Sequence, residues 1–245
     1  MTSVVLFDLD DTLFAHRRAV ELGVLAQRAE HGGDVALADD AAELHRWTQL
    51  EELHYHRYLS GELDFLDQRR HRARDFVAPY GLDLADDLAA DTWFDAYLEK
   101  YRDAWTLLPD ALPCLAELRR RIPGVRFGVI TNGELAFQTA KMDAVGLSAH
   151  VEHVIASGHV GFAKPDPRIF RLACGTFGVT PANAAYVGDR LRTDALGARD
   201  AGLTGVWLDR PDHAAPEPPD DPADPGVPRI RTLAELPDLL ARPAS

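Results

Sequence analysis

Short apolar segments rich in β-branched residues recur along the chain and alternate with stretches of helical pattern. The strands that this pattern predicts cover residues 4–7, 125–130, 151–156, 184–187 and 205–208. Proline near the predicted helix starts and glycine just past their ends delimit the helices between the later strands. Strands that alternate with helices predict an α/β fold, with a mostly parallel sheet covered by helices on both faces.

One long segment breaks the alternation. Residues 15–105 contain no convincing strand, and helices are predicted there at 36–59 and 65–76, separated by a Ser-Gly break. We therefore expect a helical subdomain at residues 15–105, inserted into a core that residues 1–14 and 106–245 form.

The C-terminal part of the chain is less regular. Residues 209–228 are rich in proline and aspartate and are predicted to form an irregular, solvated loop. Ile230 is expected to resume an edge strand, and residues 233–240 are expected to form a closing helix.

Charge and cysteine content narrow the possible functions. The formal net charge of −13 argues against a nucleic-acid partner, because a protein that holds phosphate backbones needs a basic face. The two cysteines, Cys114 and Cys174, form no C-x-x-C motif, so we expect two core residues in a reducing cytosol.

No apolar stretch approaches the ~20 residues that span a membrane. Acidic residues interrupt the N-terminal apolar run by Asp8, which argues against a secretory signal. We expect a cytoplasmic protein with no membrane partner; the oligomeric state stays open.

The first candidate site is the sequence D-L-D-D-T-L, which comes directly after the first predicted strand and begins at Asp8. Ligands of an open α/β sheet bind at the carboxyl ends of its strands, and carboxylates at i and i+2 on an extended segment point the same way. Asp8 and Asp10 could therefore act as nucleophile and proton donor. Like charges this close raise the pKa of one group, which favours an acid. Taken alone, the motif could also be a turn or a helix-capping cluster.

Two further motifs could bind an anion. I-T-N-G contains Thr131 and Asn132, ends the second predicted strand and opens a helix, where a hydroxyl and backbone N–H groups attract negative charge. K-P-D-P places Lys164 before a helix that begins with proline, so its ammonium could face a phosphate. Taken alone, the first motif is also an ordinary strand-to-helix turn, and the lysine of the second could simply be solvated.

The fourth motif, V-G-D-R-L-R-T-D, ends the fourth predicted strand and supplies two carboxylates. Asp189 comes after a flexible glycine, and Asp194 lies in the first turn of the next helix. Such a pair suits Mg²⁺, which binds few protein oxygens and several waters. The alternative is an acidic helix start that complements the helix dipole. All four motifs lie at strand ends or lead into the next helix, and this joint pattern is much more specific than any one of them.

Together the motifs resemble those of the phosphatase branch of the haloacid dehalogenase-like superfamily. The likeness extends to S-G-H-V-G-F-A-K-P-D-P-R-I-F and V-G-D-R-L-R-T-D-A-L-G-A-R-D-A-G-L and covers residue 3 to about residue 208, outside the insertion. It implies a Rossmann-like, three-layer parallel core with an all-helical cap inserted after the first motif.

The resemblance also implies a role for each matching residue in a phosphatase that acts on a small phosphorylated metabolite. Asp8 would be the nucleophile that forms an aspartyl-phosphate, and Asp10 would be the general acid and then the base. Thr131 and neighbouring N–H groups, with Asn132 among them, would hold the phosphoryl oxygens. Lys164 would neutralise charge on Asp8 and on the phosphate.

Mg²⁺ is the cofactor that the resemblance implies. Asp8 and Asp189 would bind the ion through their carboxylates, Asp10 through its backbone carbonyl, and Asp194 directly or through water.

The inserted segment carries basic and aromatic residues that a closing cap could present to the substrate. They are Arg69, Arg70, Arg72, Arg74, Trp47, Tyr55 and Tyr58. The alternative is a solvated helical face with aromatic packing. Four histidines of the same segment are expected to be surface residues rather than metal ligands, namely His45, His54, His56 and His71.

Three alternative functions remain. A haloacid dehalogenase would lack the second aspartate of the first motif and need no metal, so Asp10, Asp189 and Asp194 argue against it. A sugar-phosphate mutase would keep the same core and differ mainly in the cap. A non-catalytic binding protein on the same fold would be free to lose Asp8, Asp10 or Lys164, and all three are present.

Overall fold

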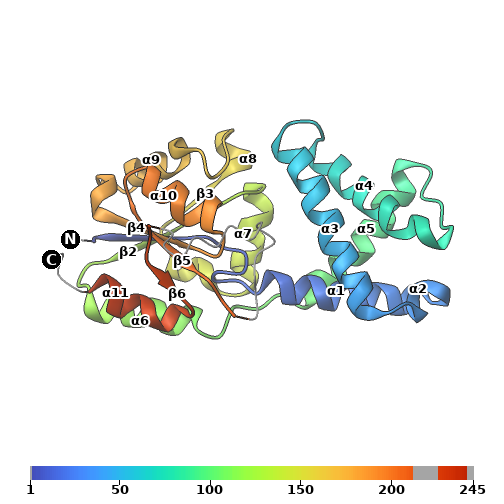
Figure 1. Cartoon of the computed structure of the whole chain (residues 1–245), viewed down its shortest axis with the longest axis horizontal. Coiled ribbons are helices and arrows are strands. Elements are labelled where there is room, and N and C mark those ends of the chain that lie inside the picture. Colours follow the sequence, from blue (N-terminus) through green and yellow to red (C-terminus); the bar gives the residue numbers. More distant parts are fainter. Residues whose placement is uncertain (1, 212–225, 242–245) are drawn as a thin grey trace. The chain divides into compact units, whose positions relative to one another are not determined.

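The computed structural model describes residues 2–211 and 226–241, which fall into two compact units (Figure 1). The core unit is formed by Met1–Ala15 and Thr106–Ser245, and the helical unit by His16–Trp105. Most of the loop predicted at 209–228 lies outside the described residues.

A six-stranded sheet forms the centre of the core unit, and all of its neighbouring strands are parallel. The strands are β1 Val4–Phe7, β2 Arg126–Thr131, β3 His153–Ala156, β4 Ala184–Gly188, β5 Thr204–Leu208 and β6 Arg229–Ile230. Their order across the sheet is β3-β2-β1-β4-β5-β6, the order of the Rossmann fold. The predicted α/β, Rossmann-like parallel sheet is therefore confirmed.

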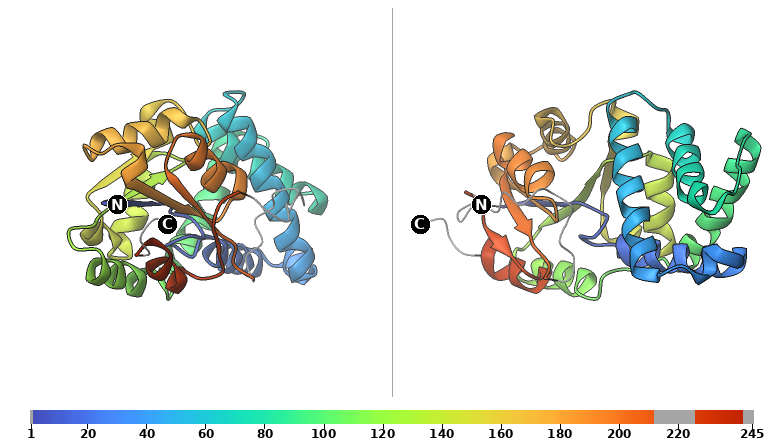
Figure 2. Two further views of the ribbon diagram at one scale, coloured as in Figure 1. Left: turned by 60° about the vertical axis from the view of Figure 1, so that its left-hand side comes forward. Right: turned by 45° about the vertical axis from the view of Figure 1, so that its right-hand side comes forward.

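Helices cover both faces of this sheet and make the core unit three-layered (Figures 1 and 2). The main core helices are α6 Ala111–Arg121, α7 Leu135–Ala144, α8 Ser157–Val160, α9 Pro167–Thr176, α10 Gly197–Asp200 and α11 Leu236–Leu240. Figure 1 shows α9 and α10 on one face of the sheet and α6 and α11 on the other. This arrangement explains why the strands read as apolar runs, because parallel strands are buried on both faces.

The first strand lies in the middle of the sheet and fixes the position of the D-L-D-D-T-L motif. All four residues of β1 are fully buried, and β1 pairs with both β2 and β4. Phe7 lies beside Val129 of β2 and beside Val187 of β4. The residue after Phe7 therefore leaves the sheet where the ends of three strands meet.

The helical unit contains α1 His16–His31, α2 Gly33–Leu37, α3 Asp40–Leu59, α4 Phe65–Val77 and α5 Asp87–Asp103. Its core surrounds Trp47, which is fully buried, with ring centroids 4.5 Å from Tyr97 and 5.0 Å from Phe76. Trp47 therefore packs the interior of the helical unit and is not a residue that a cap could present to a substrate.

Two predicted helix boundaries were wrong. The helix expected at 36–59 is interrupted at Ala38, and α3 begins only after Asp39, whose side chain accepts a hydrogen bond of 2.8 Å from the backbone of Ala42. An aspartate that caps a helix in this way favours a new start over continuation. The helix whose first turn was expected to carry Asp194 begins instead as a π-helical segment, Leu191–Leu196, which continues into α10.

Cys114 and Cys174 are buried and unpaired, as predicted. Among the described residues, no helix is both long enough and apolar enough to cross a membrane.

Candidate active site

The predicted motifs meet at one edge of the sheet. The chain runs from β1 through β2 to β3 in one direction and then returns to the other side of β1 with β4 and β5. The crevice outside the strand ends at such a reversal is where ligands bind in open α/β sheets. Asp8 comes after β1, Thr131 ends β2 and Asp189 comes after β4, so three motifs open into this crevice.

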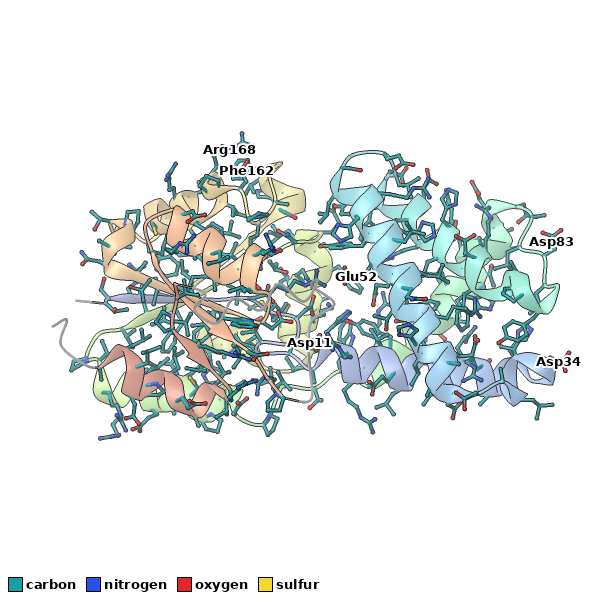
Figure 3. All side chains as sticks on the ribbon, viewed as in Figure 1. Asp11, Asp34, Glu52, Asp83, Phe162 and Arg168 are labelled. Atoms are coloured by element: carbon teal, nitrogen blue, oxygen red, sulfur yellow. The ribbon has the colours of Figure 1, made fainter. Side chains whose placement is uncertain are left out.

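A tight turn ends the first motif. Asp11 has a φ of 59°, in the left-handed region that aspartate tolerates better than most residues with a side chain. Its backbone N–H donates to the carbonyl of Phe14 at 2.8 Å. Figure 3 labels Asp11 at this turn in the core unit. The chain therefore reverses immediately after Asp8 and Asp10.

Lys164 lies at the centre of the site and is not solvated. Its ammonium donates to Asp8 Oδ1 at 2.6 Å, to Asp194 Oδ1 at 2.7 Å and to the Tyr186 hydroxyl at 2.7 Å. Burial by itself lowers the pKa of Lys164, but the charges of Asp194 and Asp8 outweigh it, and the pKa of the ammonium is raised. Lys164 is therefore a fixed cation beside the carboxylate of Asp8.

The loop that carries Lys164 is anchored on both sides. Asn132 accepts a 2.8 Å hydrogen bond from the backbone N–H of Lys164 and donates one of 3.0 Å to its carbonyl. Asp166 caps α9 by accepting from the backbone of Arg168, and the Arg168 guanidinium lies 4.7 Å from the ring centroid of Phe162. Phe162 and Arg168 are labelled in Figure 3. The side chain of Asn132 thus holds the lysine loop.

Three carboxylates lie close together here, and two of them, Asp8 and Asp194, contact Lys164. Oxygens of Asp8, Asp189 and Asp194 lie within 4.8 Å of one another, and all three residues are buried. Burial raises the pKa of Asp8 to about 7, against the opposing charge of Lys164. Burial and the charges of Asp8 and Asp194 raise the pKa of Asp189 well above its ordinary value. Hard oxygen ligands held this close fit Mg²⁺, whose charge would relieve their repulsion.

The carboxylate of Asp194 accepts hydrogen bonds at both of its oxygens. Its Oδ1 accepts from Lys164 and from the Tyr186 hydroxyl, the latter at 3.0 Å, and its Oδ2 accepts from the backbone N–H of Arg190 at 3.0 Å. A Cβ at Gly188 would lie 2.4 Å from the Asp194 carboxyl group. Only glycine at position 188 leaves room for this carboxylate.

Mg²⁺ is expected to raise the melting temperature, and to raise it more at pH 8 than at pH 5.5. Between about pH 4 and 7 the raised pKa of Asp8 makes the metal-free folded protein bind more protons than the unfolded chain. The free energy of unfolding therefore falls as the pH rises through that window, and a cation restores it. Saturation at 100 times Kd adds about 2.7 kcal/mol, roughly 5–10 °C for a chain of this size.

Thermal denaturation with and without MgCl₂ at the two pH values measures this effect. The control is Asp189→Asn, which should lose the Mg²⁺ shift and should be at least as stable as the metal-free wild type at pH 8. An equal Mg²⁺ shift at both pH values, or an undiminished shift in Asp189→Asn, would contradict a cation site among these carboxylates.

The turn that ends β2 is built around Thr131. Its hydroxyl oxygen accepts a hydrogen bond of 2.7 Å from Gln138 of α7, and Thr131 is almost fully buried. The backbone N–H of Gly133 donates to the Ser157 hydroxyl at 2.9 Å. With its oxygen engaged by Gln138, the Thr131 hydroxyl can direct its own proton at a phosphoryl oxygen.

Sequence reasoning missed three buried polar residues of the site. Tyr186 of β4 binds Lys164 and Asp194, while Gln138 and Lys141 of α7 contact Asp10. The spacing of three residues between the two α7 side chains, on a helix that leaves a candidate anion site, is a signal that could have indicated a shared face. Tyr186 stands in an apolar strand and gave no comparable signal.

The arginine cluster of the helical unit is mostly internal to that unit. Arg70 pairs with Asp91, and Arg74 pairs with Asp87. Arg72 is buried and bonds Gln68 and Glu51. The remaining member, Arg69, lies over the rings of Phe65 and Phe94 at 4.1 and 5.4 Å, and burial lowers its pKa to about 10.

The expectation that all four histidines lie on the surface was wrong for His54. It is buried, and its Nε2 lies 2.8 Å from Asp75 Oδ2. Its ring stacks on His71 with centroids 5.5 Å apart. Burial, ahead of the opposing effect of Asp75, lowers the pKa of His54, which fits a structural imidazole. His45 and His56 are exposed, as predicted.

Comparison with known families agrees with the geometry of this site. The model of the haloacid dehalogenase-like hydrolases matches residues 2–202. A glyceraldehyde 3-phosphate phosphatase of Methanopyrus kandleri is 32% identical over 226 residues, which cover 89% of this chain and 88% of that protein. A ribulose-1,5-bisphosphate 5-phosphatase of Halopiger xanaduensis is 30% identical over 98% of this chain and 100% of its own length.

A phosphoserine phosphatase of Thermus thermophilus is 47% identical, but the match spans only 44% of this chain and 43% of that protein. Among solved structures, the HAD-hydrolase YfnB of Bacillus subtilis, described as bound to magnesium, superimposes with a TM-score of 0.79 at 19% identity over 98% of this chain and 99% of its own. An L-2-haloacid dehalogenase of Xanthobacter autotrophicus gives 0.69 at 23% identity over the full length of both chains. At these identities the two structures show the fold alone.

Proposed function

Because the chain belongs to the haloacid dehalogenase-like hydrolase family, we propose that it is a Mg²⁺-dependent phosphatase that forms an aspartyl-phosphate on Asp8. One observation carries the proposal. Asp8, Asp189 and Asp194 are buried within 4.8 Å of one another, and the ammonium of Lys164 pairs with Asp8 and Asp194. This is a nucleophile, a cation and a divalent-metal site in one crevice, the components that phosphoryl transfer requires.

The relatives support a small phosphorylated metabolite as the substrate. Two relatives that align over most of the chain are named as phosphatases of glyceraldehyde 3-phosphate and of ribulose-1,5-bisphosphate. These compounds share a phosphomonoester on a small polar body and differ in the rest of the molecule. We therefore assign the class of substrate to the core unit and the choice within that class to the helical unit.

In the first step, a carboxylate oxygen of Asp8 attacks phosphorus and the bond from phosphorus to the ester oxygen breaks. Asp10 gives its proton to the departing oxygen and becomes a carboxylate. Lys164 balances the charge that gathers near Asp8, and Thr131 with the adjoining backbone N–H groups binds the equatorial oxygens. The products are an alcohol and the phosphorylated aspartate.

In the second step, water attacks phosphorus from the side that the alcohol has left. Asp10 takes a proton from this water, and the bond from phosphorus to the Asp8 oxygen breaks. Inorganic phosphate leaves with the Asp8 carboxylate restored and Asp10 protonated again. One residue thus serves as acid and then as base.

Mg²⁺ would be held by Asp8 and Asp189, by the backbone carbonyl of Asp10, and by Asp194 directly or through water. When bound, the ion would supply positive charge to the phosphoryl oxygens during transfer. The hydrogen bonds from Lys164, Tyr186 and Arg190 fix Asp194 for this task.

We propose that the helical unit is a cap that selects the substrate. The segments that enter and leave the helical unit pair with each other in the core unit. Ala15 donates a backbone hydrogen bond to Thr106 at 3.0 Å, and Phe14 bridges Leu107. Every residue assigned to the chemistry lies outside His16–Trp105, so variation within this unit can change the substrate and leave the reaction intact.

The purified protein is expected to hydrolyse p-nitrophenyl phosphate, and EDTA is expected to lower turnover by more than about 100-fold, because a metal stabilises transition-state charge by several kcal/mol. Excess Mg²⁺ should restore the rate. Release of chloride from 2-chloropropionate, measured in parallel, should be absent. Full phosphatase activity after complete removal of metal would sink the proposal, and chloride release without phosphatase activity would favour the dehalogenase alternative.

A further inference from the structure

The ammonium of Lys141, on helix α7, lies against both oxygens of Asp10. The distances from Nζ are 2.8 Å to Oδ1 and 3.0 Å to Oδ2. The Lys141 side chain is 3% exposed, whereas that of Asp10 is 28% exposed. A buried cation therefore holds the inner side of a carboxylate that remains accessible from the crevice.

Two aromatic rings line the ammonium of Lys141, and such cation–π contacts offset only part of the cost of removing it from water. Its ammonium lies 5.1 Å from the ring centroid of Phe14 and 5.3 Å from that of Phe137. Removing a lysine from water costs several kcal/mol, and a buried ion pair is often no more stabilising than apolar side chains in its place. Stability alone is thus a poor explanation for Lys141, and a role in fixing Asp10 is a better one.

Gln138, one helical turn earlier on α7, adds a second contact to the same carboxylate. Its Nε2 donates to Asp10 Oδ2 at 3.2 Å and to Thr131 Oγ1 at 2.7 Å. Residues three apart on a helix share a face, and both side chains are buried. The helix that leaves the phosphate-binding turn therefore also braces Asp10.

Two aspartates of the first motif, Asp8 and Asp10, have separate cations. Lys164 bonds Asp8, and Lys141 bonds Asp10. The first cation faces the atom that becomes phosphorylated, and the second faces the group that moves the proton. Asp8 and Asp10 are thus each paired with a lysine of their own, and the two lysines come from different segments of the chain.

We propose that Lys141 is a positioning residue that acts through Asp10. It fixes the orientation of this carboxylate, with help from Gln138, and balances its negative charge after the leaving group has taken the proton. The inference rests on the proposed phosphatase reaction. It implies that the charge of Lys141 favours release of the Asp10 proton to the alcohol, whereas activation of water by Asp10 depends on Lys141 through orientation alone.

Lys141→Met is expected to lower kcat by about 10- to 100-fold, a part of the roughly 10²–10⁴-fold that proton transfer by a positioned group such as Asp10 contributes. The loss should be larger with an alkyl phosphate such as β-glycerophosphate than with p-nitrophenyl phosphate, because nitrophenolate needs little protonation. Phosphorylated enzyme should accumulate with the aryl substrate, since its hydrolysis still needs Asp10. Lys141→Arg, which keeps a cation, should recover part of the rate.

A double-mutant cycle with Asp10→Asn separates positioning from a general structural effect. If Lys141 acts through Asp10, Lys141→Met should cost no more than about 2-fold in the Asp10→Asn background. A structural loss would multiply with that of Asp10→Asn. Lys141→Gln serves in the same cycle if the methionine variant does not fold. The matched control is Lys100→Met, since Lys100 pairs with Glu30 in the helical unit, and it should leave turnover unchanged.

The outcomes distinguish the inference from the function on which it rests. A wild-type protein without phosphatase activity would overturn the proposed function. An active wild type with wild-type kinetics in Lys141→Met and Lys141→Gln would overturn the inference alone. Equal losses with both substrates, no accumulated phosphoenzyme and a multiplicative cycle would also overturn it.

Discussion

Asp8→Asn is expected to abolish phosphatase turnover, with a loss on the order of 10⁴-fold or more, as found when an enzyme loses the nucleophile of a covalent mechanism. The amide is a poor nucleophile, and no aspartyl-phosphate can form. The fold should survive, because asparagine has the shape of aspartate and the change removes one of three crowded, buried carboxylates. Steady-state hydrolysis of p-nitrophenyl phosphate at saturating Mg²⁺ measures the loss.

The matched control is Asp166→Asn. Asp166 caps α9 two residues after Lys164, and asparagine caps helices about as well as aspartate. This variant should keep its rate within about 2-fold. Normal turnover by Asp8→Asn, with metal dependence intact, would show that another residue attacks phosphorus.

Lys164→Met is expected to lower kcat by about 10²–10³-fold, which is the usual cost of removing one preorganised charge from a buried site. The ammonium bonds both Asp8 and Asp194, so its loss leaves their charges without a partner. Methionine keeps most of the volume of the side chain. Because the lysine is buried, the variant should also melt at a lower temperature, and Mg²⁺ should recover part of that loss.

Turnover and melting of Lys164→Met should be compared with those of Lys100→Met. Lys100 also forms an ion pair, at 2.9 Å from Glu30, but its partner is exposed. Pairs of this kind contribute about 0–1 kcal/mol, so the control should match the wild type. An unchanged rate in Lys164→Met would mean that this buried cation has no part in phosphoryl transfer.

The strands of the sheet could be predicted because each strand of the core carries its own local signal. The run from Val4 to Phe7 is apolar because β1 is buried on both faces. The D-L-D-D-T-L motif comes directly after this run, so the position of the motif at the end of a strand could be predicted as well. Asp8 and Asp189 are far apart in the sequence, yet the parallel topology alone brings their strand ends together.

The contacts of helix α7 could not be predicted in this way. Lys141 and Asp10 are 131 positions apart, and nothing local in either segment specifies that they meet. Lysine on a helix is usually solvated, and only the packing of α7 beside the sheet turns this one inward. Asn132 shows a related limit, because its side chain holds the backbone of Lys164, a contact that its motif did not predict.

The predictions of helix boundaries were wrong where local detail, such as a single capping side chain, decides where a helix begins. Asp39 caps α3 and ends a helical pattern that by periodicity alone continues from residue 36. The segment after Asp189 begins as a π-helix, whose first turn carries Asp194 into the site. Wider helical turns of this kind occur mostly at functional sites, and periodicity gives no warning of them.

The most direct test of the account is to find where phosphate is attached during turnover. Asp10→Asn keeps the nucleophile but loses proton transfer, which is worth about 10²–10⁴-fold. With p-nitrophenyl phosphate, the first step should proceed in part, and the intermediate should then persist. Rapid acid quenching and then mass spectrometry should find one added phosphate on the peptide that contains Asp8 in Asp10→Asn, and none in the double variant Asp8→Asn/Asp10→Asn. Phosphate on any other residue, or its presence in the double variant, would contradict an aspartyl-phosphate mechanism at Asp8.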